Sequence, residues 1–153
     1  LLIANDAIEM FLLIQDNSAE DSLRVALQAY AKADLQMYQN KNEEALQSFL
    51  TILEKHKGES IEDETLLKIA DIYYQKKDYL KALSYYQNIL DNHKEGIYID
   101  EALFFSAEIY RKHLLDNEKA KPLYEKMVLE HPDSLYYTES RKQYRTLRGD
   151  TTI

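Results

Sequence analysis

Two sets of alanines recur along this chain at an almost constant interval, and this spacing limits the fold more than any other feature. The first set, spaced by 37 residues, consists of Ala33, Ala70 and Ala107. The second set, spaced by 37 and then 38 residues, consists of Ala45, Ala82 and Ala120. A small side chain kept at one phase marks a place where two helices approach closely, because a larger side chain would push them apart. The spacing therefore predicts an array of helical hairpins.

The clearest hairpin is predicted over residues 66–90. Apolar residues recur there at helical spacing on both sides of a short polar break at residues 75–78, so two amphipathic helices should face each other. The whole chain of 153 residues holds three Gly and two Pro, which leaves few residues suited to the tight turns between strands. We predict an all-α fold, a right-handed superhelix of about eight helices arranged as antiparallel hairpins.

The predicted organisation is a single array over residues 1–153. It has an N-terminal helix and link (1–25), three repeats (26–60, 61–99 and 100–132) and a C-terminal capping helix (133–148). Within it, Asp100 is the expected N-cap of a helix over 101–112, and the next turn, 114–117, is expected to be one residue longer than its equivalents. Asp133 or Ser134 should cap the last helix, and Gly149 should end it.

The segment between Leu1 and Ile14 is apolar on nearly all sides of a predicted helix. A helix of this kind is expected to be covered on two sides. We predict that it stacked on an upstream hairpin and that the fragment forms a homo-oligomer through this end. The alternative is that the segment packs into a groove of its own domain.

The charge of the chain excludes several functions. A net charge of −8 and a pI near 5.0 argue against a nucleic-acid partner and against binding to an anionic membrane, both of which need a basic surface. No run is long and apolar enough for membrane insertion. There is no Cys, and His56, His93 and His131 are predicted at equivalent helix C-termini, where a cation suits the helix dipole, so no metal site is expected. The chain also lacks phosphate-loop and nucleophile motifs, so we predict no cofactor, no catalytic residue and no enzymatic activity.

The pattern within each repeat resembles that of the tetratricopeptide family. A small residue late in the first helix is followed by an alanine early in the second, an aromatic residue four positions later and a proline after the second helix. Residues 26–132 carry this pattern at the following positions: Ala33, Ala45 and Phe49, then Ala70, Ala82 and Tyr86, then Ala107, Ala120, Tyr124 and Pro132. The chain has no Trp, unlike the usual pattern. Its long links and many tyrosines are similar to tetratricopeptide proteins of bacterial cell envelopes, which favours the periplasm or envelope over the cytoplasm.

The resemblance implies a concave groove lined by the first helix of each repeat. The predicted groove residues form an apolar row and a carboxylate row with two further positions: Tyr30, Leu67 and Phe104, then Asp34, Asp71 and Glu108, then Tyr74 and Arg111. The predicted function is a protein-interaction scaffold, part of a larger protein, that binds a protein or peptide segment with basic and apolar side chains. In the alternative, the acids are solvated and the apolar row belongs to the core between repeats. The chain would then be a structural spacer, a self-assembly module or an accessory module of an upstream enzyme.

Overall fold

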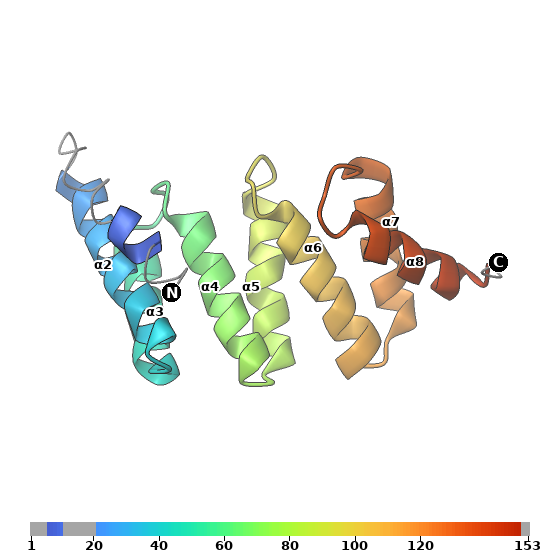
Figure 1. The fold of residues 1–153 in the computed structure, drawn as a ribbon, viewed down its shortest axis with the longest axis horizontal. Helices are drawn as coiled ribbons and strands as arrows, with labels where there is room; N and C mark the ends of the chain where they lie inside the picture. Colours follow the sequence, from blue (N-terminus) through green and yellow to red (C-terminus); the bar gives the residue numbers. More distant parts are fainter. Residues whose placement is uncertain (1–5, 11–20, 151–153) are drawn as a thin grey trace. The chain divides into compact units, whose positions relative to one another are not determined.

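The structure is a computed structural model that describes residues 6–10 and 21–150. Every regular element within these ranges is helical (Figure 1). Residues 6–10 are helical, and the remaining elements are α2 (Asp21–Tyr38), α3 (Asn42–Lys55), α4 (Glu62–Gln75), α5 (Tyr79–Asn92), α6 (Ile99–Glu108), the π-helix η1 (Ile109–His113), α7 (Asn117–Glu130) and α8 (Tyr137–Arg148). The predicted all-α fold of helix hairpins is confirmed. The chain divides into two compact units, Leu1–Ile72 and Tyr73–Ile153.

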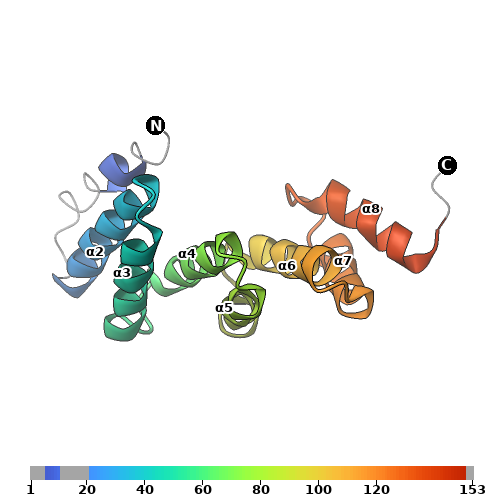
Figure 2. The same cartoon turned by 90° about the horizontal axis from the view of Figure 1, so that it is seen from below.

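The first unit is built around the hairpin of α2 and α3, which lie side by side in Figures 1 and 2. The Tyr30 and Phe49 rings meet edge to face between these two helices, with their centroids 5.4 Å apart. Helix α4 is tied to α2 by the Tyr30 hydroxyl, which donates a hydrogen bond to Glu64 at 3.0 Å. Most of the segment between Leu1 and Ile14 lies outside the described residues, so its predicted role in self-association stays a prediction.

The second unit stacks its helices in chain order, with α5 packed on α6, α6 on α7 and α7 on α8. Figure 2 shows α8 lying across the hairpin of α6 and α7. The core of the second unit includes a cluster of Ala107, Ala120 and Tyr124, all fully buried. Several half-buried side chains pack against this cluster: Phe104, Tyr110, Leu123, Tyr144 and Leu147. The last two belong to α8, which therefore packs on this core.

The repeated alanines occupy the close contacts that their spacing predicted. All members of both sets are 0% exposed: Ala33, Ala70, Ala107, Ala45, Ala82 and Ala120. The predicted helix ends are also confirmed, since His56, His93 and His131 are the C-cap residues of α3, α5 and α7.

The three hairpin turns have the same length, which corrects the prediction of a longer third turn. Each turn has three residues (39–41, 76–78 and 114–116), with its middle residue at positive φ, namely Asn40, Lys77 and Leu115. The additional residue between Ala107 and Ala120 is instead taken up by η1, in which the Leu114 amide bonds back to Ile109. Inserting one residue into a helix as a π-bulge keeps the rest of the hairpin in register.

Two predicted helix caps are wrong. Helix α6 starts at Ile99 with Tyr98 as its N-cap, and a carboxylate oxygen of Asp100 instead lies 2.8 Å from His131 Nδ1. Helix α8 starts after Tyr136, and Ser134 instead accepts a hydrogen bond from the Tyr136 amide at 3.1 Å, which stabilises the preceding turn. Gly149 does end α8, with φ of 87°.

Leu115 allows a prediction on stability. A leucine at φ of 53° is strained, since the left-handed region costs most non-glycine residues about 1–2 kcal/mol, and its side chain is 79% exposed. We expect Leu115→Gly to raise the free energy of unfolding by about 0.5–1 kcal/mol, after the entropy cost of glycine is subtracted. Thermal denaturation measures this change. Leu135→Gly is the control, since Leu135 is 97% exposed at a position without positive φ, and a gain of equal size there would contradict the explanation.

Candidate functional site

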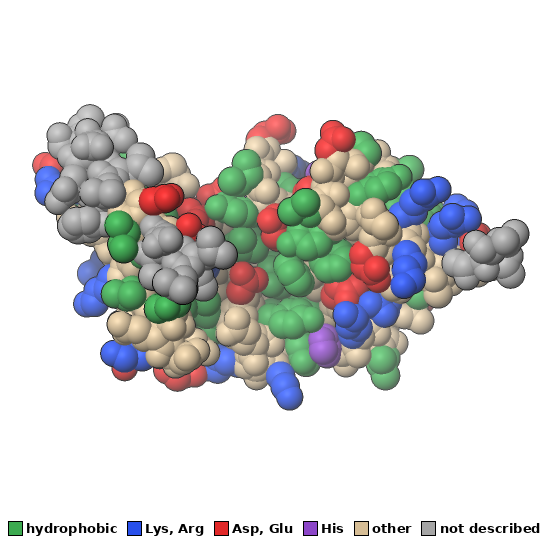
Figure 3. Space-filling view, viewed as in Figure 1, with side chains coloured by type: hydrophobic (Ala, Val, Ile, Leu, Met, Phe, Trp, Pro, Cys, Tyr) green, Lys and Arg blue, Asp and Glu red, His purple; other side chains and the backbone are tan. Residues whose placement is uncertain are grey.

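Six aromatic side chains of the second unit form a row of rings in contact, which we call the aromatic row. Its members are Tyr79, His113, Tyr74, Phe105, Phe104 and Tyr136. All of them are half-buried except His113, which is exposed. Figure 3 shows apolar side chains gathered over α6, the helix that carries Phe104 and Phe105. Rings that are half-buried keep one face or edge available to a ligand, so this row is a candidate contact surface.

One end of the row is held together by His113. Its ring stacks on Tyr79 at 4.1 Å between centroids, with the planes 11° apart. Its Nε2 atom lies 3.2 Å from the Tyr74 hydroxyl. These contacts fix three rings from α4, α5 and η1 in one arrangement, which lowers the entropy cost of binding.

The other end of the row is an aromatic stack between α6 and the start of α8. The Phe104 and Tyr136 rings are stacked at 4.6 Å. Phe105 touches both, at 5.5 Å from Phe104 and 5.7 Å from Tyr136. It also lies 6.0 Å from Tyr74, edge to face, and so connects the two ends of the row.

A buried carboxylate, Glu108, lies in the same helix and is surrounded by donors of its own chain. Glu108 is 4% exposed. Its carboxylate accepts hydrogen bonds from Arg111 at 3.0 and 3.1 Å and from the Tyr124 hydroxyl, and Lys112 Nζ lies 2.5 Å from it. We call these four residues the Glu108 cluster. It has two cations and one carboxylate, so it is cationic at neutral pH.

The pKa shifts in this region follow from these contacts. Burial alone would raise the pKa of Glu108, but hydrogen bonds from Lys112, Tyr124 and Arg111 outweigh it and hold that pKa below its ordinary value. Burial also raises the pKa of the Tyr74 hydroxyl, with the charge of Lys112 opposing the rise and that of Glu108 adding to it. Tyr74 therefore lies within electrostatic reach of the Glu108 cluster, and the two features adjoin.

The predicted groove residues of the first unit are more enclosed. Tyr30 is 1% exposed, Asp34 is 6% exposed and Leu67 is 9% exposed. Lys68 Nζ lies 3.0 Å from a carboxylate oxygen of Asp34, so this acid already has a cation from its own unit. Asp71 is half-buried.

The second unit thus brings together four of the predicted groove residues: Tyr74, Phe104, Glu108 and Arg111. The sequence predicts Glu108 as part of a carboxylate row that meets basic side chains of a partner, whereas in the structure it pairs with Arg111 and Lys112 of its own chain. No role was predicted for Phe105 or His113. His113 is the last residue of η1, and a single inserted residue in a helix carries no pattern that periodicity analysis detects.

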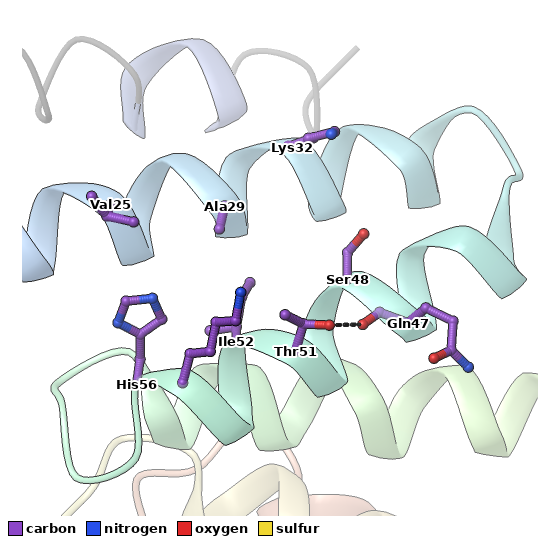
Figure 4. A pocket seen from close by; sticks show the side chains of 9 residues that line it. Val25, Ala29, Lys32, Gln47, Ser48, Thr51, Ile52 and His56 are labelled. Carbon is purple, nitrogen blue, oxygen red and sulfur yellow. Dashed lines mark hydrogen bonds between the residues drawn. The ribbon is translucent and has the colours of Figure 1, made fainter.

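A cavity of about 350 Å³ lies in the first unit between α2 and α3 (Figure 4). Val25, Ala29 and Ile52 make part of its lining apolar, and His56 stands at one end. His56 Nδ1 is 3.1 Å from a carboxylate oxygen of Glu59, so its ring is already engaged.

Among residues 6–10 and 21–150, no group of three or more His, Cys, Asp or Glu side chains is placed to hold a metal ion. Within the same ranges no helix has the length and apolar character to span a membrane.

Comparisons with known proteins agree with this fold. A family model described as tetratricopeptide repeat matches residues 64–95 and 101–134, which fall on the second and third predicted repeats. No curated protein matches the chain.

Among solved structures, the chain is similar to a tetratricopeptide repeat protein from Parabacteroides merdae ATCC 43184, with a TM-score of 0.66 and 21% identity. The match covers 96% of this chain and 54% of that one, so the chain spans about half the length of that protein. At this identity the likeness concerns the fold alone. The repeats matched at residues 64–95 and 101–134, together with this fold, support the assignment of the chain to a tetratricopeptide repeat family.

Proposed function

We propose that the chain is a protein-interaction scaffold that binds a segment of a partner protein on the aromatic row of its second unit. Tetratricopeptide repeats generally mediate protein–protein interaction, and the family is typically non-enzymatic. The observation that carries the proposal is the row itself, in which six rings are in contact and none is fully buried. Aromatic residues held in this way are enriched at the centres of protein interfaces.

The contacts suggest the chemistry of the segment. Tyr74 and Phe104 offer ring faces and edges to an apolar or aromatic side chain. Arg111 acts at the edge of the row, where Glu108 positions it. Because Glu108 and Asp34 already have cationic partners, basic side chains of the partner are not part of this proposal.

The predicted groove residues of the first unit are not part of the proposed surface, which belongs to the second unit. Tyr30 and Leu67 hold the core behind α2 and α4, and Asp34 anchors Lys68. Asp71 of the same unit is half-buried.

A peptide library displayed on phage tests the proposal. Peptides selected on the intact chain are synthesised, and their affinities are measured by fluorescence anisotropy. We expect His113→Ala and Phe104→Ala each to weaken binding by about tenfold or more, as for a residue at the centre of an interface. His113 is exposed, so its replacement should leave the fold intact, which circular dichroism verifies.

The control variant is Leu129→Ala, which removes a side chain of α7 that is 72% exposed and lies outside the row. It should bind the selected peptides as the unmodified chain does. Selected peptides that bind both row variants with full affinity would overturn the proposal. Failure to select any peptide would instead support the alternative that the chain is a structural spacer. A role as an accessory module of an enzyme would have to be tested on the whole protein.

A further inference from the structure

A stripe of arginines runs along α8, the last helix of the second unit. The chain has five arginines, and three of them, Arg141, Arg145 and Arg148, occur within eight residues at spacings of four and three. These spacings place them on one side of a helix. Lys142 adds a fourth cation beside them. Figure 3 shows Lys and Arg side chains gathered over α8, and all four residues are exposed. We call them the arginine stripe.

The stripe is not used to hold α8 in place. The helix is anchored by its other side, through Tyr144, Leu147 and the fully buried Ser140. Tyr144 also donates a hydrogen bond to Glu125 of α7 at 2.9 Å. The stripe can therefore be changed with little effect on the core.

Few acids of the unit neutralise the stripe. Asp150 pairs with Arg148 and lies 3.9 Å from Arg145. The side chains of Arg141 and Lys142 have no ion pair or hydrogen bond among the described residues. Four cations against one carboxylate leave a local charge of about +3 at neutral pH.

The first unit has the opposite charge. Leu1–Ile72 contains fourteen Asp and Glu against six Lys and Arg, a net charge of −8, whereas Tyr73–Ile153 contains thirteen of each and is neutral. Several of these acids are exposed and have no partner among the described residues, namely Asp21, Glu44 and Glu54. The whole negative charge of the chain therefore resides in one unit, and the densest cationic surface resides in the other.

We propose that the arginine stripe of one copy binds the acidic first unit of a second copy. Guanidinium groups form paired hydrogen bonds with carboxylates, and α8 presents three of them in line. Because the two surfaces differ, a bound pair still has one free stripe and one free acidic unit, and association continues head to tail. The aromatic row takes no part in this contact. A negative result for self-association would therefore leave the proposed binding function untouched, and the reverse is also true.

Sedimentation of the intact chain at low and high salt tests the proposal. We expect the average mass to rise with protein concentration in about 20 mM salt and to fall toward that of a single copy in about 500 mM salt, where charges are screened within a few ångströms. Association through the apolar segment between Leu1 and Ile14 would show the opposite trend, because salting-out strengthens apolar contacts.

Charge reversal identifies the surface. Arg141→Glu with Arg145→Glu should weaken the association at low salt by about tenfold or more. The control, Lys94→Glu with Lys126→Glu, changes the net charge equally at exposed positions of the second unit and should still associate. Arg141→Gln with Arg145→Gln gives a milder version, should the reversal affect folding. A single copy at every salt concentration, or equal loss in the control, would overturn the proposal.

Zero-length coupling of amines to carboxylates locates the other half of the contact. Lys142 has the only amine of the stripe. In a mixture of ¹⁴N- and ¹⁵N-labelled chains, mixed-isotope peptides should join Lys142 to a carboxylate of the first unit. Mixed-isotope links from Lys142 exclusively to the second unit would contradict the proposal.

Discussion

Glu108→Gln is expected to lower the free energy of unfolding of the chain by about 2–3 kcal/mol at neutral pH. Removing one partner of a buried ion pair costs about 3–5 kcal/mol, and the lower value applies because Lys112 and Arg111 are partly exposed. The glutamine amide oxygen can still accept a hydrogen bond, but the amide is neutral. It therefore lacks the negative charge that holds Arg111, Lys112 and the Tyr124 hydroxyl. Denaturation by urea, followed by circular dichroism, measures the change.

The pH dependence of this effect distinguishes a charge effect from a packing effect. The folded state lowers the pKa of Glu108 below its ordinary value of 4.5. A depressed pKa means that the stability contributed by the carboxylate is fully present above the unfolded value and is lost as pH falls through the folded value. The two proteins should therefore converge in stability as the pH falls below the lowered folded-state pKa of Glu108.

Glu130→Gln is the matched control, because Glu130 is exposed at the end of α7 and has no ion pair among the described residues. It should change the free energy of unfolding by less than about 0.5 kcal/mol. A loss for Glu108→Gln that is the same at pH 7 and at pH 3 would mean that the side chain acts by its shape alone.

What the sequence could predict in this chain depends on how far each feature repeats. The alanines recur three times at a fixed phase, so their burial and the hairpin fold follow from the spacing. The histidines at the helix ends recur in the same way. Each of these positions has the same structural role in every repeat, so the same residue type recurs there and the sequence pattern can be recognised.

The features that were mispredicted or missed occur once. The π-helix η1 places one extra residue inside a helix, where hydrophobic periodicity predicted a longer turn. The pairing of Asp100 with His131 joins residues that are distant in sequence, and it competes with the local cap that the sequence favoured. The Glu108 cluster shows a similar limit, since the sequence shows an acid but not the donors that neutralise it. The candidate site is thus less predictable than the fold that supports it.

Leucine at Ala82 or Ala120 is expected to destabilise the chain by about 1–3 kcal/mol, the cost of overpacking a filled core. Both alanines are 0% exposed. Ala120 lies in the cluster with Ala107 and Tyr124, where three added carbon atoms have no space unless α6 and α7 move apart. Thermal denaturation of Ala82→Leu and Ala120→Leu measures the loss.

The control is Ala31→Leu, at a half-buried position of α2 that lies outside the repeated alanine sets. There the larger side chain can extend into solvent, and the change in stability should stay within about 0.5 kcal/mol. Because separation of α6 and α7 would also shift Phe104 and Phe105 relative to Tyr136, Ala120→Leu should weaken any peptide bound on the aromatic row, whereas Ala31→Leu should not. Equal stability of Ala120→Leu and the unmodified chain would show that this alanine does not set the distance between the helices, and the explanation of its fixed phase would have to be abandoned.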